Sequence, residues 1–301
     1  MSLRAAGAAI LALSTLFGAG CGGGDAGPAV SGEPISVQEL ARSASTTADA
    51  ASGRFSFEVA ATLPGSSERF AMSGEGAFDA ASKRARFAVD MSSVAKVLGG
   101  FIPGLAGPNA VDLPDFDDPD GWKIELVQDG KVEYVRFPAI DDQLPAGTSW
   151  LRGADGISAG AVDFRQFTSG DPREALDALR GIAGEIETMG SENLRGIETT
   201  RYRAILDPAE LAKARDREGR SASPSVVERL TRSGVDDIPV HVWIDADGLI
   251  KKLTMALSAT QPGTTQSSEA SISFELWDYG EPVEIAVPPA SEVADASALR
   301  G

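Results

Sequence analysis

The sequence predicts an α+β fold in which one large antiparallel β-sheet carries helices on one side. Apolar and polar residues alternate along several segments between residues 54 and 279, which is the period of strands with one buried face. Two Asp-Gly pairs each stand between two such segments, as in tight hairpins. Helical segments interrupt the strands without the regular alternation that a parallel sheet requires.

The first twenty residues have the composition of a signal peptide. Arg4 precedes the uncharged run Ala8 to Gly20, and these 13 residues span only about 20 Å as a helix, short of the ~30 Å hydrocarbon core of a bilayer. Small residues at 18–20 then precede Cys21, the only cysteine of the chain. We therefore expect residues 1–20 to be removed during export.

The small residues before Cys21 resemble the bacterial lipobox, where a signal peptidase cuts before a cysteine that already bears a diacylglyceryl group. This resemblance implies that Cys21 is the acylated N-terminus and the membrane anchor. The alternative is an ordinary signal peptide beside an inert thiol. Residues 21–34 are rich in glycine and proline and indicate a flexible tether, so residues 35–301 are left as a single folded domain.

Helix signals stand at three places in this domain. The first helix is predicted over Ser36 to Ala51, with Ser36 as N-cap and Glu39 as its capping-box partner. A second is predicted from Asp171-Pro172 through about Ile182, and Asp207-Pro208 opens a third before a charged stretch.

The strands fall into three predicted groups. The first is a set of three antiparallel strands between Arg54 and Met91. Residues 122–137 then form a hairpin around Asp129-Gly130, and residues 240–257 form another around Asp247-Gly248. Residues 271–279 supply a partner strand for the last hairpin.

The charge and the residue types argue against several classes of function. The formal charge is −17, and it becomes −18 when residues 1–20, which hold Arg4 and no acid, are removed. Such a chain is repelled by nucleic acid and by anionic lipid headgroups. His241, the only histidine, stands mid-strand, and no serine or cysteine has a recognisable nucleophile context. We expect neither an enzyme nor a bound cofactor or metal, and the acidic stretch 112–121 fits no calcium loop.

The apolar stretch Val94 to Gly107 permits two interpretations. Its glycines weaken a stable helix, while Phe101, Ile102 and Leu105 are apolar without an evident reason to be buried. The stretch is either a short helix that covers the core or a flap over the mouth of a cavity.

Three segments resemble a known family: "GSENLRGIETTRYRAILD" (190–207), "VWIDADGLIKKL" (242–253) and "YGEPVEIAVPPASEV" (279–293). They resemble the actinobacterial cell-envelope lipoproteins of the LppX/LprG type, which are similar in fold to the lipoprotein carrier LolA. The resemblance implies a strongly curved sheet, a half-barrel, with helices packed on its concave side around an apolar cavity for acyl chains.

The sequence and the resemblance together predict a membrane-anchored, extracytoplasmic and non-enzymatic protein that binds or carries a lipid or another apolar ligand. An envelope transporter or acceptor protein would be its further partner. The alternative is a structural or sensory lipoprotein whose core is filled. The candidates for the cavity wall share one period-two face of the strands, and they are Phe57, Val59, Phe87, Val89, Ile124, Val240 and Val242.

Overall fold

The structure, a computed structural model, describes residues 33–62, 69–99, 118–153, 158–159, 162–163, 176, 178–207, 209–211, 213, 237–260 and 267–295. Its strands are β1 (Ser52–Thr62), β2 (Arg69–Asp79), β3 (Arg84–Asp90), β4 (Lys123–Asp129), β5 (Val132–Arg136), β6 (Trp150–Arg152), β7 (Ser158–Ala159), β8 (Val162–Asp163), β9 (Ile182–Leu194), β10 (Ile197–Leu206), β11 (Ile238–Asp245), β12 (Ile250–Thr260), β13 (Ser267–Trp277) and β14 (Val293–Asp295). Its helices are α1 (Val37–Ala48) and α2 (Ser92–Gly99), with short 3₁₀ helices η2 (Asp120–Trp122), η3 (Pro138–Gln143), η4 (Leu179–Gly181) and η5 (Ala290–Glu292).

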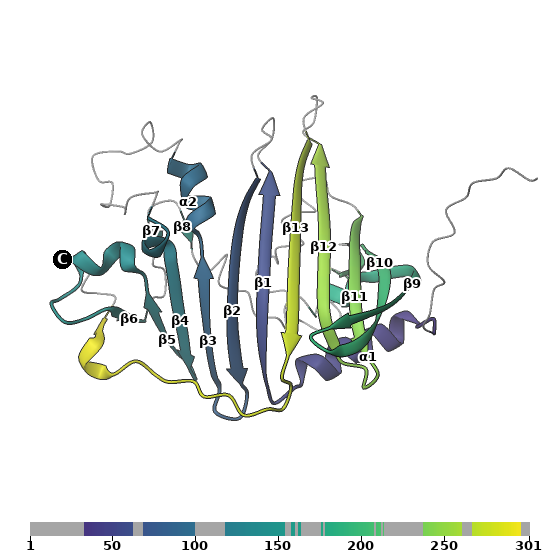
Figure 1. Cartoon of the computed structure of the whole chain (residues 1–301), viewed down its shortest axis with the longest axis horizontal. Coiled ribbons are helices and arrows are strands. Elements are labelled where there is room, and N and C mark those ends of the chain that lie inside the picture. The colour runs from purple at the N-terminus through teal and green to yellow at the C-terminus, as the bar shows by residue number, and fades with distance from the viewer. Residues whose placement is uncertain are drawn as a thin grey trace, which may run out of the picture.

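One 12-stranded sheet dominates the described residues, in the order β14-β6-β5-β4-β3-β2-β1-β13-β12-β11-β10-β9 (Figure 1). Neighbouring strands are antiparallel except β14 and β6, which run parallel. The pairing of β1 with β13 joins the two halves of the chain at the centre of the sheet. β7 and β8 form a separate two-stranded sheet.

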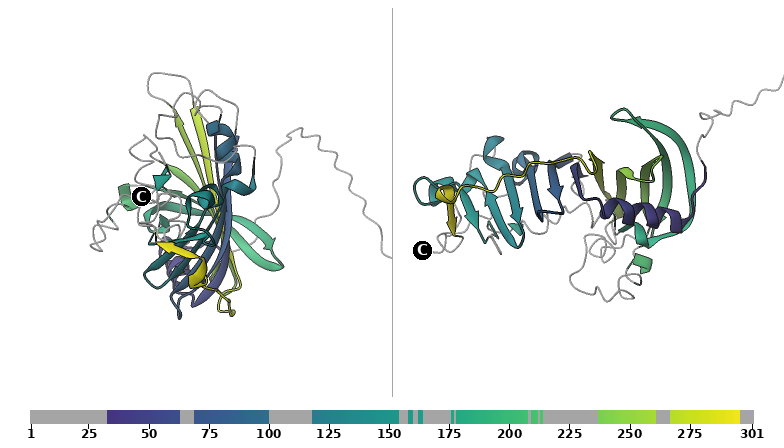
Figure 2. Two further views of the ribbon diagram at one scale, coloured as in Figure 1. Left: turned by 90° about the vertical axis from the view of Figure 1, so that its left-hand side faces the viewer. Right: turned by 90° about the horizontal axis from the view of Figure 1, so that it is seen from below.

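The sheet is curved and does not close, and β9 and β10 curl away from its plane at one end (Figure 2). This shape and the pairing pattern confirm the predicted fold class, an α+β half-barrel built on a large antiparallel sheet. The two Asp-Gly hairpins are also confirmed, because Gly130 and Gly248 have positive φ angles of 62° and 79° at the β4–β5 and β11–β12 turns.

One face of the sheet is apolar and carries the helices. Alternate residues of the central strands enter a single hydrophobic cluster, which also holds Leu40 and Ala44 of α1, Ala95 of α2 and Leu179 of η4. We call this surface the apolar face. The opposite surface, the polar face, presents the charged and hydroxyl residues that alternate with the core residues along the same strands.

The first helix begins as predicted. Ser36 is the N-cap of α1, its Oγ accepts from the backbone N–H of Glu39, and the Glu39 carboxylate accepts from the backbone N–H of Ser36. The helix ends at Ala48 rather than at Ala51, because Ser52 already pairs in β1.

The second predicted helix ends close to its expected end at about Ile182. Residues 171–175 lie outside the described residues, positions 176 and 178 are helical, and η4 ends the helical stretch so that Ile182 is the first residue of β9. The third helix start is supported, since Asp207 accepts from the backbone N–H of Ala209 at 2.8 Å. The sequence patterns between residues 182 and 206 did not identify β9 and β10 as strands.

The stretch Val94 to Gly107 is helical where it is described. Residues 94–99 belong to α2, and Ala95 is buried in the core, so this part covers the core. Phe101, Ile102 and Leu105 lie outside the described residues, as do the predicted signal peptide and Cys21. No helix within the described part of the chain is both long and apolar enough to cross a membrane.

After β13 the chain crosses from the middle of the sheet to its edge. It runs along one end of the strands and pairs as β14 with β6 (Figure 1). On the way Ile285 packs with Val127 and Trp150 in a second, smaller apolar cluster. Ser52 fixes the start of this crossing through a hydrogen bond from its Oγ to the carbonyl of Glu281 at 2.7 Å.

Candidate functional site

Aromatic rings cover the glycines of β2 on the apolar face. Gly74 pairs with Phe57 in the register of β1 and β2, and a Cβ at Gly74 would lie 2.6 Å from Cε1 of that ring. A Cβ at Gly76 would lie 2.7 Å from Cζ of Phe55. The two glycines therefore allow the rings to lie across the strand instead of projecting from it.

The seven residues predicted to line a cavity all belong to the same hydrophobic cluster. Five of them are packed, with at most 5% of their surface exposed, and these are Phe57, Val89, Ile124, Val240 and Val242. The other two, Val59 and Phe87, are only partly buried. The structure thus brings the predicted residues together on one face, and their contact with a ligand stays a prediction.

Two pairs of partly exposed apolar residues lie on this face. Val59 of β1 stands opposite Ile272 of β13, and Phe87 of β3 stands opposite Leu126 of β4. All four side chains are only partly buried although they pack against the core. Apolar surface on this face is therefore incompletely covered at several positions, which include these two pairs.

Polar groups fasten α1 to the β11–β12 hairpin at one end of the apolar face. Thr47 Oγ1 of α1 accepts from the backbone N–H of Ile250 at 3.0 Å. A buried ion pair joins Lys251 Nζ to Asp245 Oδ2 at 3.1 Å, and the ring of Tyr279 lies 4.5 Å from the same Nζ. Burial raises the pKa of Tyr279, whose hydroxyl donates to the carbonyl of Ile250. These contacts hold α1 and Tyr279 against the β11–β12 hairpin.

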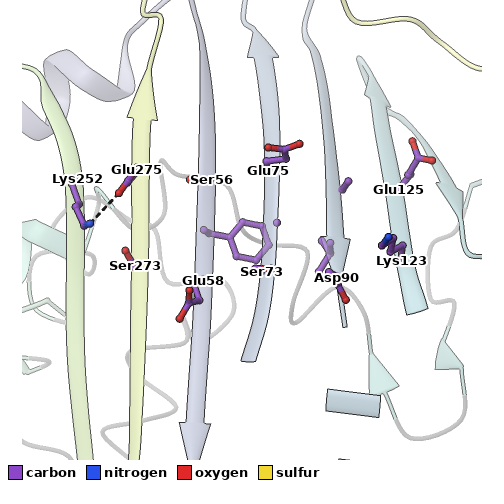
Figure 3. A pocket seen from close by; sticks show the side chains of 14 residues that line it. Ser56, Glu58, Ser73, Glu75, Asp90, Lys123, Glu125, Lys252, Ser273 and Glu275 are labelled. Carbon is purple, nitrogen blue, oxygen red and sulfur yellow. Dashed lines mark hydrogen bonds and ion pairs between the residues drawn. The ribbon is translucent and has the colours of Figure 1, made fainter. Parts of the chain in front are cut away.

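The polar face holds a hollow of about 680 Å³ that spans six strands, from β12 across β13, β1, β2 and β3 to β4 (Figure 3). Each of the six strands contributes at least one charged residue to it, alongside small residues such as Ser56, Ser73 and Gly74. The polar residues that line it are Ser56, Glu58, Ser73, Glu75, Asp90, Lys123, Glu125, Lys252, Ser273 and Glu275.

Cations compensate the carboxylates at the two ends of the hollow. Glu275 lies 3.0 Å from Lys252, shown by the dashed line in Figure 3, and 3.3 Å from Arg195. Burial raises the pKa of Glu275, but the hydrogen bond and charge of Lys252, with the charge of Arg195, outweigh it and hold that pKa below its ordinary value. At the other end Glu125 pairs with Arg86 and Arg136.

His241 also lies on the polar face, outside the hollow. Its Nδ1 accepts from Nε of Arg201 at 3.3 Å, and its ring lies 6.1 Å from that of Trp243. Burial, and then the charges of Arg201 and Arg203, lower the pKa of His241. A histidine bonded to a guanidinium is poorly placed to act as a general base.

Within the described residues, no three histidine, cysteine or acidic side chains come close enough together to hold a metal ion. The sequence did not lead us to expect the hollow. Serine and acidic residues that alternate with the core residues of β1, β2 and β13 were the pattern that could have indicated it.

Comparison with known proteins gives one curated relative. An uncharacterised 31.2 kDa protein of Streptomyces griseus, from the rplA-rplJ intergenic region, is 24% identical over 210 residues, which is 65% of this chain. The match spans 66% of that relative, just under two thirds of its length. No family model matches the sequence.

Several solved structures are similar. The lipoprotein LppX of Mycobacterium tuberculosis is 15% identical, with a TM-score of 0.43, over 83% of this chain and 97% of that one. LprF of Mycobacterium bovis is 15% identical, with a TM-score of 0.44, over 85% and 99%. A LolA superfamily protein of Nitrosomonas europaea has 8% identity and a TM-score of 0.26, over 81% and 94%. All three TM-scores are below 0.5 and all three identities are below 25%, so the family resemblance stays a prediction from the sequence.

Proposed function

We propose that the protein is an extracytoplasmic lipoprotein, anchored through acylated Cys21, that binds a lipid or another amphiphile against the apolar face. The incomplete cover of this face carries the proposal. Four side chains stay partly exposed beside packed residues of the same face, and these are Val59, Ile272, Phe87 and Leu126. Covering such side chains contributes roughly 25 cal/mol per Å² of apolar area removed from water, and acyl chains would supply that cover.

The polar hollow is an unsuitable place for an acyl chain. Its lining includes Phe57, Ala88 and Val89 but also five carboxylates and two lysines, and burying a charge beneath a methylene chain costs several kcal/mol unless the charge is paired. An apolar ligand therefore belongs on the opposite face, between the sheet and the helices.

A second function has its own support. Five of the seven predicted residues are as tightly buried as ordinary core residues, which favours a structural or sensory lipoprotein with a filled core. The two functions predict different effects of a charged residue at the partly exposed positions. Such a residue would weaken ligand binding in a binding protein, whereas a protein with a filled core has no ligand to lose.

The test of binding is a titration with an environment-sensitive fluorescent fatty acid. Val59→Asp and Phe87→Asp should each raise the Kd of the probe roughly 10- to 100-fold, since a buried Val or Phe contributes about 1.5–3 kcal/mol. Val132→Asp is the matched control, because Val132 is exposed at the β4–β5 turn and lies outside this cluster. Equal affinities for all three variants, or no binding by the parent protein, would favour the filled core.

The anchor is tested separately. Cys21→Ala should abolish metabolic labelling with palmitate and leave the chain soluble or uncleaved, because no other thiol is available. Normal cleavage with unaltered membrane retention would overturn acylation at this residue.

A further inference from the structure

The β9–β10 hairpin holds two of the three exposed large apolar residues in the described part of the chain. Met189 is 44% exposed and Ile197 is 39% exposed, while the third, Val132 at 38%, lies at the β4–β5 turn. β9 is also the last strand of the sheet, so its outer edge has no partner strand within the described residues.

A bulge places Met189 outside the regular pairing. Gly190 pairs with Arg201 and Thr188 pairs with Tyr202, so Met189 is the extra residue between two consecutive pairs. Gly190 has a φ of 106°, a conformation that other residues rarely adopt. The bulge breaks the alternation of β9 and leaves an apolar side chain in solvent.

The N-terminal end of the described chain lies beside this bulge. The hydroxyl of Tyr202 donates to the carbonyl of Glu33 at 3.1 Å. Twelve residue steps separate Glu33 from Cys21, and a Gly-rich chain of this length has a root-mean-square span of about 17–21 Å. The β5 strand that carries Val132 lies eight strand spacings from β10, about 38 Å along the sheet at ~4.8 Å each.

We propose that the β9–β10 hairpin is the membrane-contacting surface of the protein, with Met189 and Ile197 at the headgroup region of the bilayer to which Cys21 is anchored. The inference rests on the proposed anchor and adds which part of the domain faces the membrane. An anchor at Cys21 keeps this hairpin closer to the bilayer than the β4–β5 turn, and the hairpin presents apolar side chains there.

The contact is shallow and does not depend on anionic lipid. β9 has no partner strand on its outer side among the described residues, and backbone groups at a sheet edge need hydrogen-bond partners that the hydrocarbon core lacks, so the strand stays at headgroup depth. The acids of the hairpin are Glu185, Glu187, Glu192 and Glu198, against Arg195 in the turn and Arg201 and Arg203 in β10, which gives the hairpin a net charge of −1. Zwitterionic vesicles should therefore bind the hairpin at least as well as anionic ones.

The test uses the full acylated chain in phosphatidylcholine vesicles. Cys21 is the only native cysteine and acylation occupies its thiol, so Met189→Cys, Ile197→Cys and Val132→Cys each add one thiol that a fluorophore can label. Quenching by a lipid that carries a nitroxide near its headgroup should be several-fold stronger at 189 and 197 than at 132. Labelled chains are compared only after flotation has confirmed that they are attached to the vesicles.

Each outcome is decisive. Equal quenching at the three sites, or stronger quenching at 132, on chains that float with the vesicles would overturn the hairpin contact and leave the anchor intact. Chains that retain a free Cys21 thiol and do not float would overturn the anchor and, with it, the inference. Circular dichroism of each labelled variant shows whether the sheet has been preserved, and agreement between 189 and 197 guards against a local effect of either substitution.

Discussion

Replacing Gly74 by alanine tests whether the ring of Phe57 covers β2 as described. The new Cβ would lie 2.5 Å from the carbonyl oxygen of Ala88 and 2.6 Å from Cε1 of Phe57. Carbon atoms pack best at about 3.5–4.0 Å, so the ring and the neighbouring strand must both move by roughly 1 Å. The Phe57 ring would also be displaced from Phe274, whose centroid is 6.1 Å away.

The expected change in the free energy of unfolding follows from two opposing effects. Overpacking a core typically costs about 1–3 kcal/mol, while the reduced freedom of the unfolded chain on Gly→Ala returns about 0.4–1 kcal/mol. We expect a net loss of about 1–2 kcal/mol. For a domain of this size that corresponds to a fall in Tm of roughly 2–8 °C.

Differential scanning calorimetry or thermal circular dichroism measures the change, with Gly53→Ala as the control. At Gly53 the nearest atoms are two ring carbons of Phe78 at 3.1 Å, which can give way, so the control should lose less stability. In a Phe57→Ala background the loss caused by Gly74→Ala should shrink, because one of the two clashes is gone. An unchanged or raised Tm for Gly74→Ala, or additive losses in the double variant, would show that the ring of Phe57 does not cover β2 in this way.

Three further predictions concern the core, a buried ion pair and pH. Val242→Trp should lower Tm through overpacking of about 1–3 kcal/mol, whereas Val59→Trp, at a partly exposed site, should lower probe binding with a smaller loss of Tm; equal Tm losses would contradict this difference. Lys251→Met should cost up to about 3–5 kcal/mol in urea unfolding because the buried Asp245 carboxylate loses its cation and keeps only the backbone N–H groups of Asp247 and Leu249, and a loss below about 1 kcal/mol would count against it. The pKa of His241 is lowered in the folded protein, so the unfolded chain binds more protons as the pH falls. The stability that neutral His241 contributes is therefore present above about pH 6.5 and is lost at lower pH. His241→Gln should flatten the dependence of Tm on pH between about 7 and 5, and an unchanged slope would argue against a lowered pKa at His241.

Local signals in the sequence predicted much of the fold. The Ser36 and Glu39 pair fixed the start of α1, and the glycines after Asp129 and Asp247 fixed two hairpins, because each depends only on residues a few positions apart. The alternation in β1, β2 and β3 identified the apolar face for the same reason.

The β9–β10 hairpin could not be predicted in this way. β9 has positive φ angles at Gly184 and Gly190 and is interrupted by bulges, so its apolar residues do not recur at every second position. Its outer edge is unpaired within the described residues, and its sequence is rich in acids, which suits an edge strand but weakens the strand pattern. Pairing with β10, which no local signal reveals, defines it as a strand.

The difference between a cavity wall and a filled core was also beyond the sequence. Alternation shows that Phe57, Val59 and Val242 share a face, but it does not show what packs against that face. The helices that contribute Leu40 and Ala95 to the core do so through contacts far apart in the chain. Only the structure therefore shows that Val59 and Phe87 are less buried than the other predicted residues.

Organic extraction and mass spectrometry of the purified domain test the central claim most directly. The chain is expressed without residues 1–21, so that any lipid recovered is bound rather than attached to Cys21. A lipid or other amphiphile should co-purify with the parent protein and be depleted in Phe87→Asp, with Val132→Asp retaining it. A correctly folded protein that yields no lipid and takes up no apolar probe would rule out lipid binding and identify the apolar face as core alone.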